Sequence, residues 1–205
     1  MPAEAPYQRI VSMSRVRVMF AIPLEEKEFA RDLGRSDVDF VRNCCLGEWL
    51  PYKREVIQPA RRMIKEARRF GARVITDASL GDWGAMFGEP LDVVILITHW
   101  LGDTIEFRDG MHSVSDVVGR MPAGFNGAID LCVCHPEPLA VAIRDDFPEA
   151  VAHFPAIPAN PRTFFPYIRA LLWRLSAEDC AYLTAAREII DAYVTAEPAD
   201  RRKTA

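Results

Sequence analysis

Two continuous apolar runs between residues 92 and 136 constrain the fold of this chain more than any other feature. The first run (DVVILITH) ends at His99, and the second (GAIDLCVC) ends at Cys134. Short apolar runs without alternation are typical of parallel strands that helices cover on both faces. We therefore expect two buried strands that deliver a histidine and a cysteine to the same edge of one sheet.

Strand and helix patterns alternate along the rest of the chain. Further strands are predicted over residues 15–22, 72–77 and 151–157, and helices over residues 24–33, 55–70, 139–146, 162–175 and 176–194. Asp109-Gly110 with alternating flanks predicts a hairpin over residues 104–114. Ser115 is expected to cap a short helix after the hairpin, and Ser176 to cap the last helix. The pattern predicts an α/β fold with a mainly parallel central sheet flanked by helices.

Length and charge limit the domain organisation and the class of partner. With 205 residues the chain is long enough for one large domain, which we place at residues 15–194. Residues 1–14 are expected to be a flexible N-terminal arm, and residues 195–205 a disordered tail. The net charge of −4 argues against a general nucleic-acid binder, and no apolar run is long enough to span a membrane.

The cysteines and histidines do not follow the spacing of a metal site. The cysteine count of five is odd, and Cys44 and Cys45 are adjacent, which favours reduced thiols in a cytoplasmic protein without a secretory signal. No phosphate-binding glycine motif is present. We expect no metal and no cofactor.

The helix predicted over residues 55–70 has a strongly basic outer face. It carries five cationic side chains: Arg61, Arg62, Lys65, Arg68 and Arg69. Such a face can attract an anionic partner, although a solvated helix surface is the simpler interpretation.

A cysteine and a histidine at one sheet edge can perform nucleophilic catalysis. A thiolate attacks, and the adjacent imidazole accepts and later returns the proton. Cys132 competes with Cys134 for the role of nucleophile, because alternate side chains of a strand face the same way. Cys134 is preferred because it lies at the end of the strand, where it can meet solvent and substrate, whereas Cys132 is expected to be buried.

The order of these segments resembles that of the caspase-like cysteine peptidases, with the CHAT branch most similar and the metacaspases more distant. The shared order is a strand ending in His99, an Asp-Gly hairpin, a helix, and a strand ending in Cys134 followed by His135. The resemblance implies a three-layer caspase-like sandwich and a cysteine endopeptidase that acts on protein or peptide substrates. His99 would be the general base and acid, Cys134 the nucleophile, and a partner protein would regulate the enzyme.

Two residues next to the dyad depart from the family pattern. The family usually has glycine after the histidine, where this chain has Trp100, and small residues after the Cys-His pair, where it has Pro136. The resemblance implies an oxyanion hole formed by the backbone N–H groups of Trp100 and Cys134. Asp130 and Cys132 would help to bind the substrate, although Asp130 can equally be paired within the structure.

Two other functions fit the same sequence. One is a catalytically silent caspase-like module that acts through protein–protein interaction, which Trp100 and Pro136 favour. The other is a flavodoxin-like binder of small molecules in which His99 and Cys134 are incidental. The position of Cys134 relative to His99 at an open strand-end cleft is the observation that separates these functions.

Overall fold

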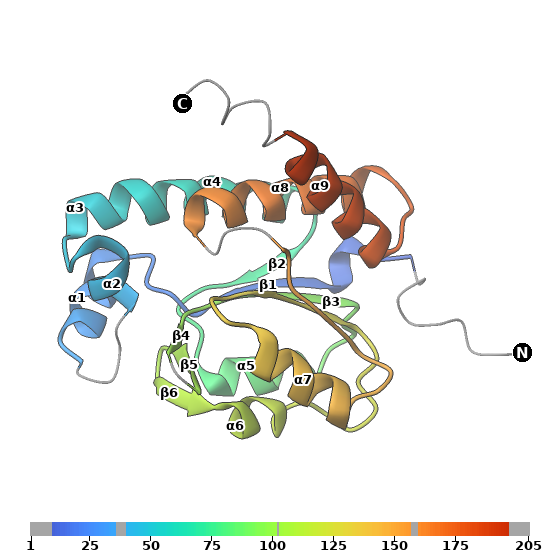
Figure 1. The fold of residues 1–205 in the computed structure, drawn as a ribbon, viewed down its shortest axis with the longest axis horizontal. Helices are drawn as coiled ribbons and strands as arrows, with labels where there is room; N and C mark the ends of the chain where they lie inside the picture. The colour runs from blue at the N-terminus through green and yellow to red at the C-terminus, as the bar shows by residue number, and fades with distance from the viewer. Residues whose placement is uncertain (1–9, 36–39, 102, 157–159, 197–205) are drawn as a thin grey trace, which may run out of the picture.

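A five-stranded parallel sheet forms the centre of the protein (Figure 1). The computed structural model describes residues 10–35, 40–101, 103–156 and 160–196. The strands are β1 (Val16–Phe20), β2 (Arg73–Ile75), β3 (Val93–Ile97), β7 (Ala128–Cys132) and β8 (Val151–His153), in the order β2-β1-β3-β7-β8. Each neighbouring pair is parallel. The prediction of an α/β fold with a mainly parallel central sheet is therefore confirmed.

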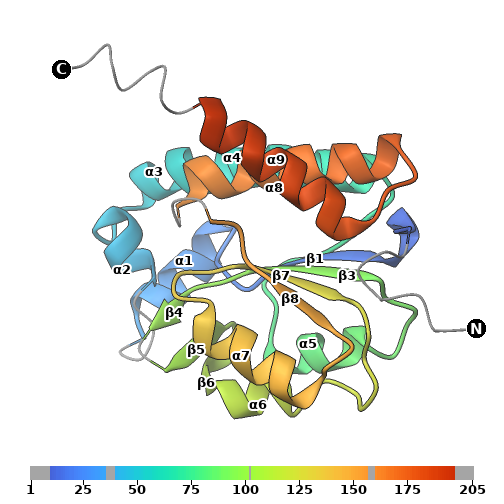
Figure 2. The same ribbon diagram turned by 45° about the vertical axis from the view of Figure 1, so that its right-hand side comes forward.

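Helices cover both faces of this sheet (Figure 1, Figure 2). One face carries α4 (Gln58–Arg69), α8 (Pro161–Ala177) and α9 (Tyr182–Ala196), and the other carries α5 (Leu80–Met86), α6 (Val114–Val118) and α7 (Glu137–Asp146). Helices α1 (Glu26–Leu33), α2 (Phe40–Cys45) and α3 (Trp49–Tyr52) lie at one end of the sheet. No helix in the described ranges is long and apolar enough to cross a membrane.

Alternate residues of the central strands pack into two hydrophobic cores, one on each face of the sheet. Val93, Ile95 and Ile97 of β3 pack with the helices α4 and α8, whereas Val94 and Leu96 pack on the opposite side. All five residues are buried. Because neither face of β3 meets water, its sequence shows a continuous apolar run instead of alternation.

The basic helix predicted over residues 55–70 is present as α4, preceded by a π-helical segment, Lys53–Ile57. Ala60, Met63, Ile64 and Ala67 are buried, which is the spacing of one helix face. The five cationic residues of the opposite face are exposed.

A small antiparallel sheet lies between β3 and β7 in the chain. It consists of β4 (Trp100–Leu101), β5 (Thr104–Phe107) and β6 (Gly110–Ser113), in that order. Strands β5 and β6 are the hairpin that Asp109-Gly110 predicted. Strand β4 was not predicted, because a two-residue strand has no periodicity to detect.

Two predicted helix starts are wrong. Ser113, not Ser115, caps α6, because the Ser113 side chain accepts a hydrogen bond from the backbone N–H of Asp116. Ser176 does not begin the last helix, since α8 continues through it and its hydroxyl donates to the carbonyl of Trp173. The last helix, α9, begins at Tyr182.

Part of the predicted N-terminal arm packs against the domain. Ile10 forms an isolated antiparallel bridge with Ala181, and the Ser12 N–H donates to the Asp92 carboxylate at 3.2 Å. Residues 1–9 of the predicted arm and residues 197–205 of the predicted tail lie outside the described residues.

Gly127 is required by a close backbone approach at the start of β7. A Cβ atom at this position would lie 2.8 Å from the carbonyl oxygen of Asp92 and 2.7 Å from the Phe125 ring. The Asp92 carbonyl is fixed by the N–H of Ala128, which donates to it at 2.8 Å. We expect Gly127→Ala to lower the free energy of unfolding by about 1–3 kcal/mol, measured by urea denaturation.

Gly81→Ala is the matched control. The nearest atom to a Cβ at Gly81 is the Ser79 hydroxyl at 3.4 Å, so this substitution on α5 is expected to be neutral or slightly stabilising. Equal urea midpoints for the two variants would contradict the close approach at Gly127.

Candidate functional site

His99 and Cys134 occupy equivalent places on neighbouring strands. Ile97 of β3 pairs with Cys132 of β7 at the carboxyl ends of both strands, and His99 and Cys134 each follow this pair by two residues. The two side chains line one cavity of about 40 Å³, together with Cys132, Asn160 and residues of α8. The structure therefore brings the predicted histidine and cysteine to the same cavity.

A second, wider cavity adjoins Cys134. It has a volume of about 390 Å³, which lies within the usual range for ligand pockets. Three of its lining residues carry polar side chains: Cys134, His135 and Glu137. The others are apolar: Leu131, Val133, Pro136, Phe154, Pro155, Ala156 and Phe164. Cys134 and Phe164 line both cavities. Cys134 thus lies between a narrow cavity that contains the histidine and a wider one able to hold a side chain of a ligand.

The small antiparallel sheet fixes the backbone around His99. The N–H of Glu106 donates to the His99 carbonyl at 2.9 Å, and the Thr98 hydroxyl donates to the Glu106 carbonyl. Glu106 lies on β5 and is only 1% exposed. Glu106 was not predicted as part of the site, although its charge between Ile105 and Phe107 of the hairpin is visible in the sequence.

The chain turns sharply immediately after Cys134. Strand β7 ends at Cys132, and His135 has a positive φ of 54°, which is uncommon for a residue other than glycine. Helix α7 then begins after Pro136, and Pro138 occupies its first turn. Since proline has no N–H, two of the backbone donors that a helix N-terminus normally offers are missing next to Cys134.

Burial controls the chemistry of the Cys134 thiol. The side chain is partly buried, and this burial raises its pKa above the ordinary value for cysteine. Desolvation has this effect because it disfavours the charged thiolate. In this conformation Cys134 is therefore mainly a thiol at neutral pH, and it needs a proton acceptor to become a nucleophile.

Cys132 is fully enclosed. It is 1% exposed, and burial together with the nearby Asp130 carboxylate raises the pKa of its thiol well above the ordinary value. Cys132 packs with the core on the α4 and α8 side, whereas Cys134 packs against the opposite core, although both line the narrow cavity. The expectation that the two sulfurs face the same way fails because the strand ends at Cys132 and alternation ends with it.

Asp130 forms the centre of a buried polar network. It is 0% exposed, and it accepts hydrogen bonds from the hydroxyl of Tyr167 at 2.7 Å and from the hydroxyl of Tyr182. His153 Nδ1 lies 3.5 Å from the same carboxylate and 2.9 Å from the Tyr182 hydroxyl. Asp130 lines neither cavity beside Cys134. The structural pairing that the sequence offered as the alternative is present, and the partners are two tyrosines and a histidine.

Trp100 turns its side chain away from both cavities. It is 3% exposed and packs with the core that contains Ile105 and Phe107. Trp100 lies opposite Ile105, and the adjacent hydrogen bond runs from the Glu106 N–H to the His99 carbonyl. Trp100 and Ile105 therefore form a non-hydrogen-bonded pair of the antiparallel ladder, in which the backbone N–H of Trp100 points away from β5. The indole therefore does not occupy the cavity at the strand ends.

Among the described residues, no three His, Cys, Asp or Glu side chains gather as possible metal ligands.

The raised pKa of Cys134 predicts slow alkylation at neutral pH. We expect the rate of its reaction with iodoacetamide to rise about tenfold per pH unit below that pKa, measured by mass spectrometry of the labelled peptides. Cys132 should stay unmodified in the folded protein and react in urea, which serves as the control. A rate at Cys134 that is independent of pH between about 6 and 9 would show a thiolate of low pKa and contradict this prediction.

The tyrosines around Asp130 predict loss of stability at alkaline pH. Burial and the Asp130 carboxylate raise the pKa of Tyr167 and Tyr182 far above the ordinary value of 10. The folded state then keeps protons that the unfolded state releases, so stability is fully present below pH 10 and falls above it. Each tyrosine contributes a slope of about 1.4 kcal/mol per pH unit.

Tyr182→Phe tests this linkage. The variant should be about 1–3 kcal/mol less stable at neutral pH, because a buried hydrogen bond to the carboxylate is lost. Its stability should also decline less steeply than that of the wild type above pH 10, in urea titrations at several pH values. Identical alkaline slopes for the two proteins would exclude the proposed linkage.

Comparison with protein-family models finds no match for this chain, and a search of curated proteins finds no significantly similar protein.

Proposed function

We propose that this protein is a caspase-like, CHAT-type cysteine endopeptidase with His99 and Cys134 as its catalytic dyad. The observation that carries the proposal is that both side chains line one cavity, at the carboxyl ends of the neighbouring strands β3 and β7. Ligands of open parallel sheets bind at this edge. The wider cavity beside Cys134 supplies space for a side chain of a peptide substrate.

The topology supports the same proposal. The parallel strands follow the order β2-β1-β3-β7-β8, and a small antiparallel sheet is inserted between the strand before His99 and the strand before Cys134. Helices cover both faces. We propose on this basis that the fold is a three-layer caspase-like sandwich.

In each half of the reaction His99 first accepts a proton and then returns it. His99 takes the proton of the Cys134 thiol, and the sulfur attacks the carbonyl carbon of the peptide bond. The tetrahedral intermediate collapses as the protonated His99 gives its proton to the leaving amine, which leaves an acyl-enzyme. His99 then takes a proton from water, and the hydroxyl adds to the acyl carbon. The bond between carbon and sulfur breaks, His99 returns its proton to the sulfur, and the carboxylic acid departs.

The oxyanion must be stabilised by donors near Cys134. The backbone N–H groups of Trp100 and Cys134 are the donors that we propose. Asn160 is a third candidate, since its amide oxygen accepts from the N–H of Arg162 at 3.0 Å and its amide NH₂ remains a donor on a residue that lines the cavity. Asn160 also caps α8, whose dipole favours negative charge at this end.

The resting state of the site calls for activation. A cavity of about 40 Å³ cannot hold a peptide, so substrate or a regulatory partner protein must move its apolar walls before the reaction begins. The raised pKa of the Cys134 thiol also supports activation, because binding that brings a cationic or hydrogen-bond-donating group closer to the sulfur would lower this pKa. Free cysteines are typical of reducing compartments, and we propose a cytoplasmic location.

A catalytically silent caspase-like module is the second candidate. Burial of Cys134 and the missing N–H groups of Pro136 and Pro138 favour it, since they weaken both the nucleophile and the surroundings of an oxyanion. A flavodoxin-like binder of small molecules has less support. Its ligand would sit where the strand order reverses, between β1 and β3, and the cavity that reaches Ile22 and Ile97 there has only about 40 Å³.

Cleavage of a peptide library by Cys134→Ala and Cys132→Ala tests the proposal. We expect Cys134→Ala to abolish cleavage, by at least about 10³-fold, and His99→Ala to reduce it by a similar factor. Cys132→Ala should keep activity in the range of the wild type, because its sulfur is enclosed. Melting temperatures identify any variant that has lost its fold.

Three outcomes would count against the assignment. Loss of cleavage only in Cys132→Ala would show that the other sulfur is the nucleophile. Cleavage retained in Cys134→Ala would exclude thiol catalysis by this residue. No cleavage by the wild type, with or without a bound partner protein, would favour the silent module.

A further inference from the structure

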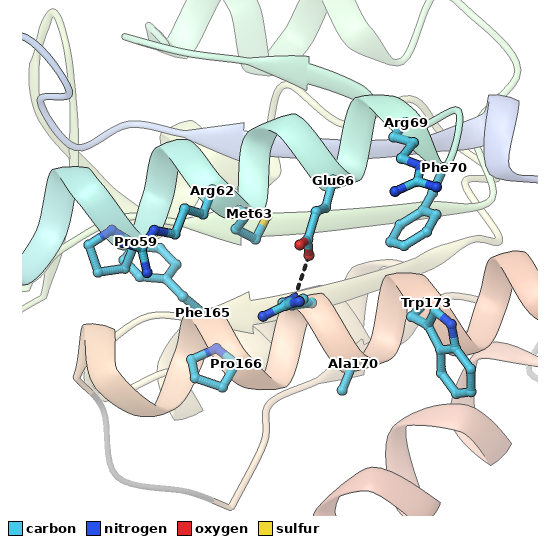
Figure 3. Close-up of a pocket in the computed structure, with 11 residues that line it drawn as sticks. Pro59, Arg62, Met63, Glu66, Arg69, Phe70, Phe165, Pro166, Ala170 and Trp173 are labelled. Atoms are coloured by element: carbon cyan, nitrogen blue, oxygen red, sulfur yellow. Dashed lines mark ion pairs between the residues drawn. The ribbon is translucent and has the colours of Figure 1, made fainter.

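A groove on the outer surface between α4 and α8 is separate from the candidate active site. It has a volume of about 710 Å³, and Figure 3 shows it with its lining residues. Its floor is apolar, with Met63 and Phe165 almost fully buried. Trp173 stands at one end of the groove and is 57% exposed, so its indole is available to a bound ligand.

The rim of the groove is basic. Arg62 and Arg69 on α4 and Arg169 on α8 line it, and all three are exposed. The chain as a whole has a net charge of −4, so this face is positive on a negatively charged protein. Such a local excess of one charge attracts segments of the opposite charge and disfavours others.

Two of these arginines, Arg62 and Arg69, form no ion pair within the described part of the chain. Glu66 is the single carboxylate of the lining, and Arg169 holds it at 2.5 Å (Figure 3). Among the residues that the structure describes, no carboxylate lies within ion-pair distance of Arg62 or Arg69. Their guanidinium groups thus remain for an external anion, and a carboxylate can pair with each through two parallel hydrogen bonds.

We infer that this groove binds an acidic segment of a partner protein that carries an aromatic or large aliphatic anchor residue. The anchor packs against Trp173 and the apolar floor, and carboxylates on either side of it pair with Arg62 and Arg69. Apolar anchors in a groove between two helices with charged rims are a common way to bind a short peptide segment. The inference rests on the groove alone and does not depend on the chemistry of Cys134.

The groove fits a peptide better than a nucleic acid or a lipid surface. Nucleic acids are bound through many phosphate contacts on a broadly basic protein, and the net charge of −4 opposes this. A membrane surface is bound by a broad exposed apolar face, whereas Met63 and Phe165 are buried and Trp173 is the single exposed large apolar side chain among the described residues of the lining. A short acidic segment interacts only with the local charge, so it escapes the repulsion of the rest of the molecule.

Selection from a display library of random short peptides, with the full chain as bait, tests this inference. Enriched peptides should contain an excess of Asp and Glu around an aromatic or large aliphatic residue. Synthetic copies of these peptides are then measured by fluorescence anisotropy. Arg62→Glu/Arg69→Glu and, separately, Trp173→Ser should each weaken binding by at least about tenfold. Both sets of side chains are exposed, so the variants should keep the wild-type melting temperature.

Arg120→Glu is the matched control, because Arg120 is exposed and follows α6 on the opposite face of the sheet. It makes the same change in net charge per residue and should leave peptide binding unchanged. A labelled single-stranded oligonucleotide and anionic phosphatidylserine vesicles are measured in parallel.

The inference is overturned if the enriched peptides show no excess of acidic residues. It is also overturned if the groove variants bind the selected peptides as tightly as the control variant does. Tighter binding of the oligonucleotide or the vesicles than of any peptide, lost in Arg62→Glu/Arg69→Glu, would replace the protein partner by a nucleic acid or a lipid surface.

Discussion

The buried carboxylate of Asp130 determines how the second half of the chain closes over the sheet. A carboxylate with no exposure costs several kcal/mol unless hydrogen bonds replace its water. The donors come from α8 and α9, through Tyr167 and Tyr182, with His153 of β8 beside them. Strand β8 and the helices α8 and α9, which all follow β7 in the chain, therefore contact the single Asp130 carboxylate of β7. The removal of any one donor would leave the others around a poorly satisfied charge, so the network favours a single arrangement of these helices.

Helix α8 connects this network to both surfaces that we consider functional. The N-cap residue of α8, Asn160, and the first turn of the helix line the cavity that contains His99 and Cys134. The outer face of α8 forms one side of the basic groove. Phe165 lines the groove and the narrow cavity alike. A segment bound on the outside would thus contact a side chain that also bounds the thiol. Packed interiors transmit such displacements because they hold few voids, which gives a physical route by which the partner protein that we propose would act on the site.

The fold was predictable where the signal is local. Apolar runs gave β3 and β7, three-four spacing gave α4, and Asp109-Gly110 gave the β5–β6 hairpin. The start of α9 was not predictable, because Ser176 has the sequence pattern of a helix cap although α8 continues through this residue. The neighbouring placement of His99 and Cys134 followed from strand order. The surroundings of Asp130 could not be predicted, since Tyr167 and Tyr182 lie 37 and 52 residues away in the chain, and the direction of Trp100 depends on its pairing with β5.

The strand order also has a consequence for the growing polypeptide. Strands β2, β1 and β3 are contiguous both in the sheet and in the first half of the sequence, so they can associate before β7 leaves the ribosome. Until then β3 is an edge strand whose two faces are both apolar, and its free backbone groups form a template for pairing with another chain. The arrival of β7 both covers this edge and completes the pair of His99 and Cys134. The same step, the pairing of β7 with β3, thus protects the nascent chain from aggregation and assembles the site.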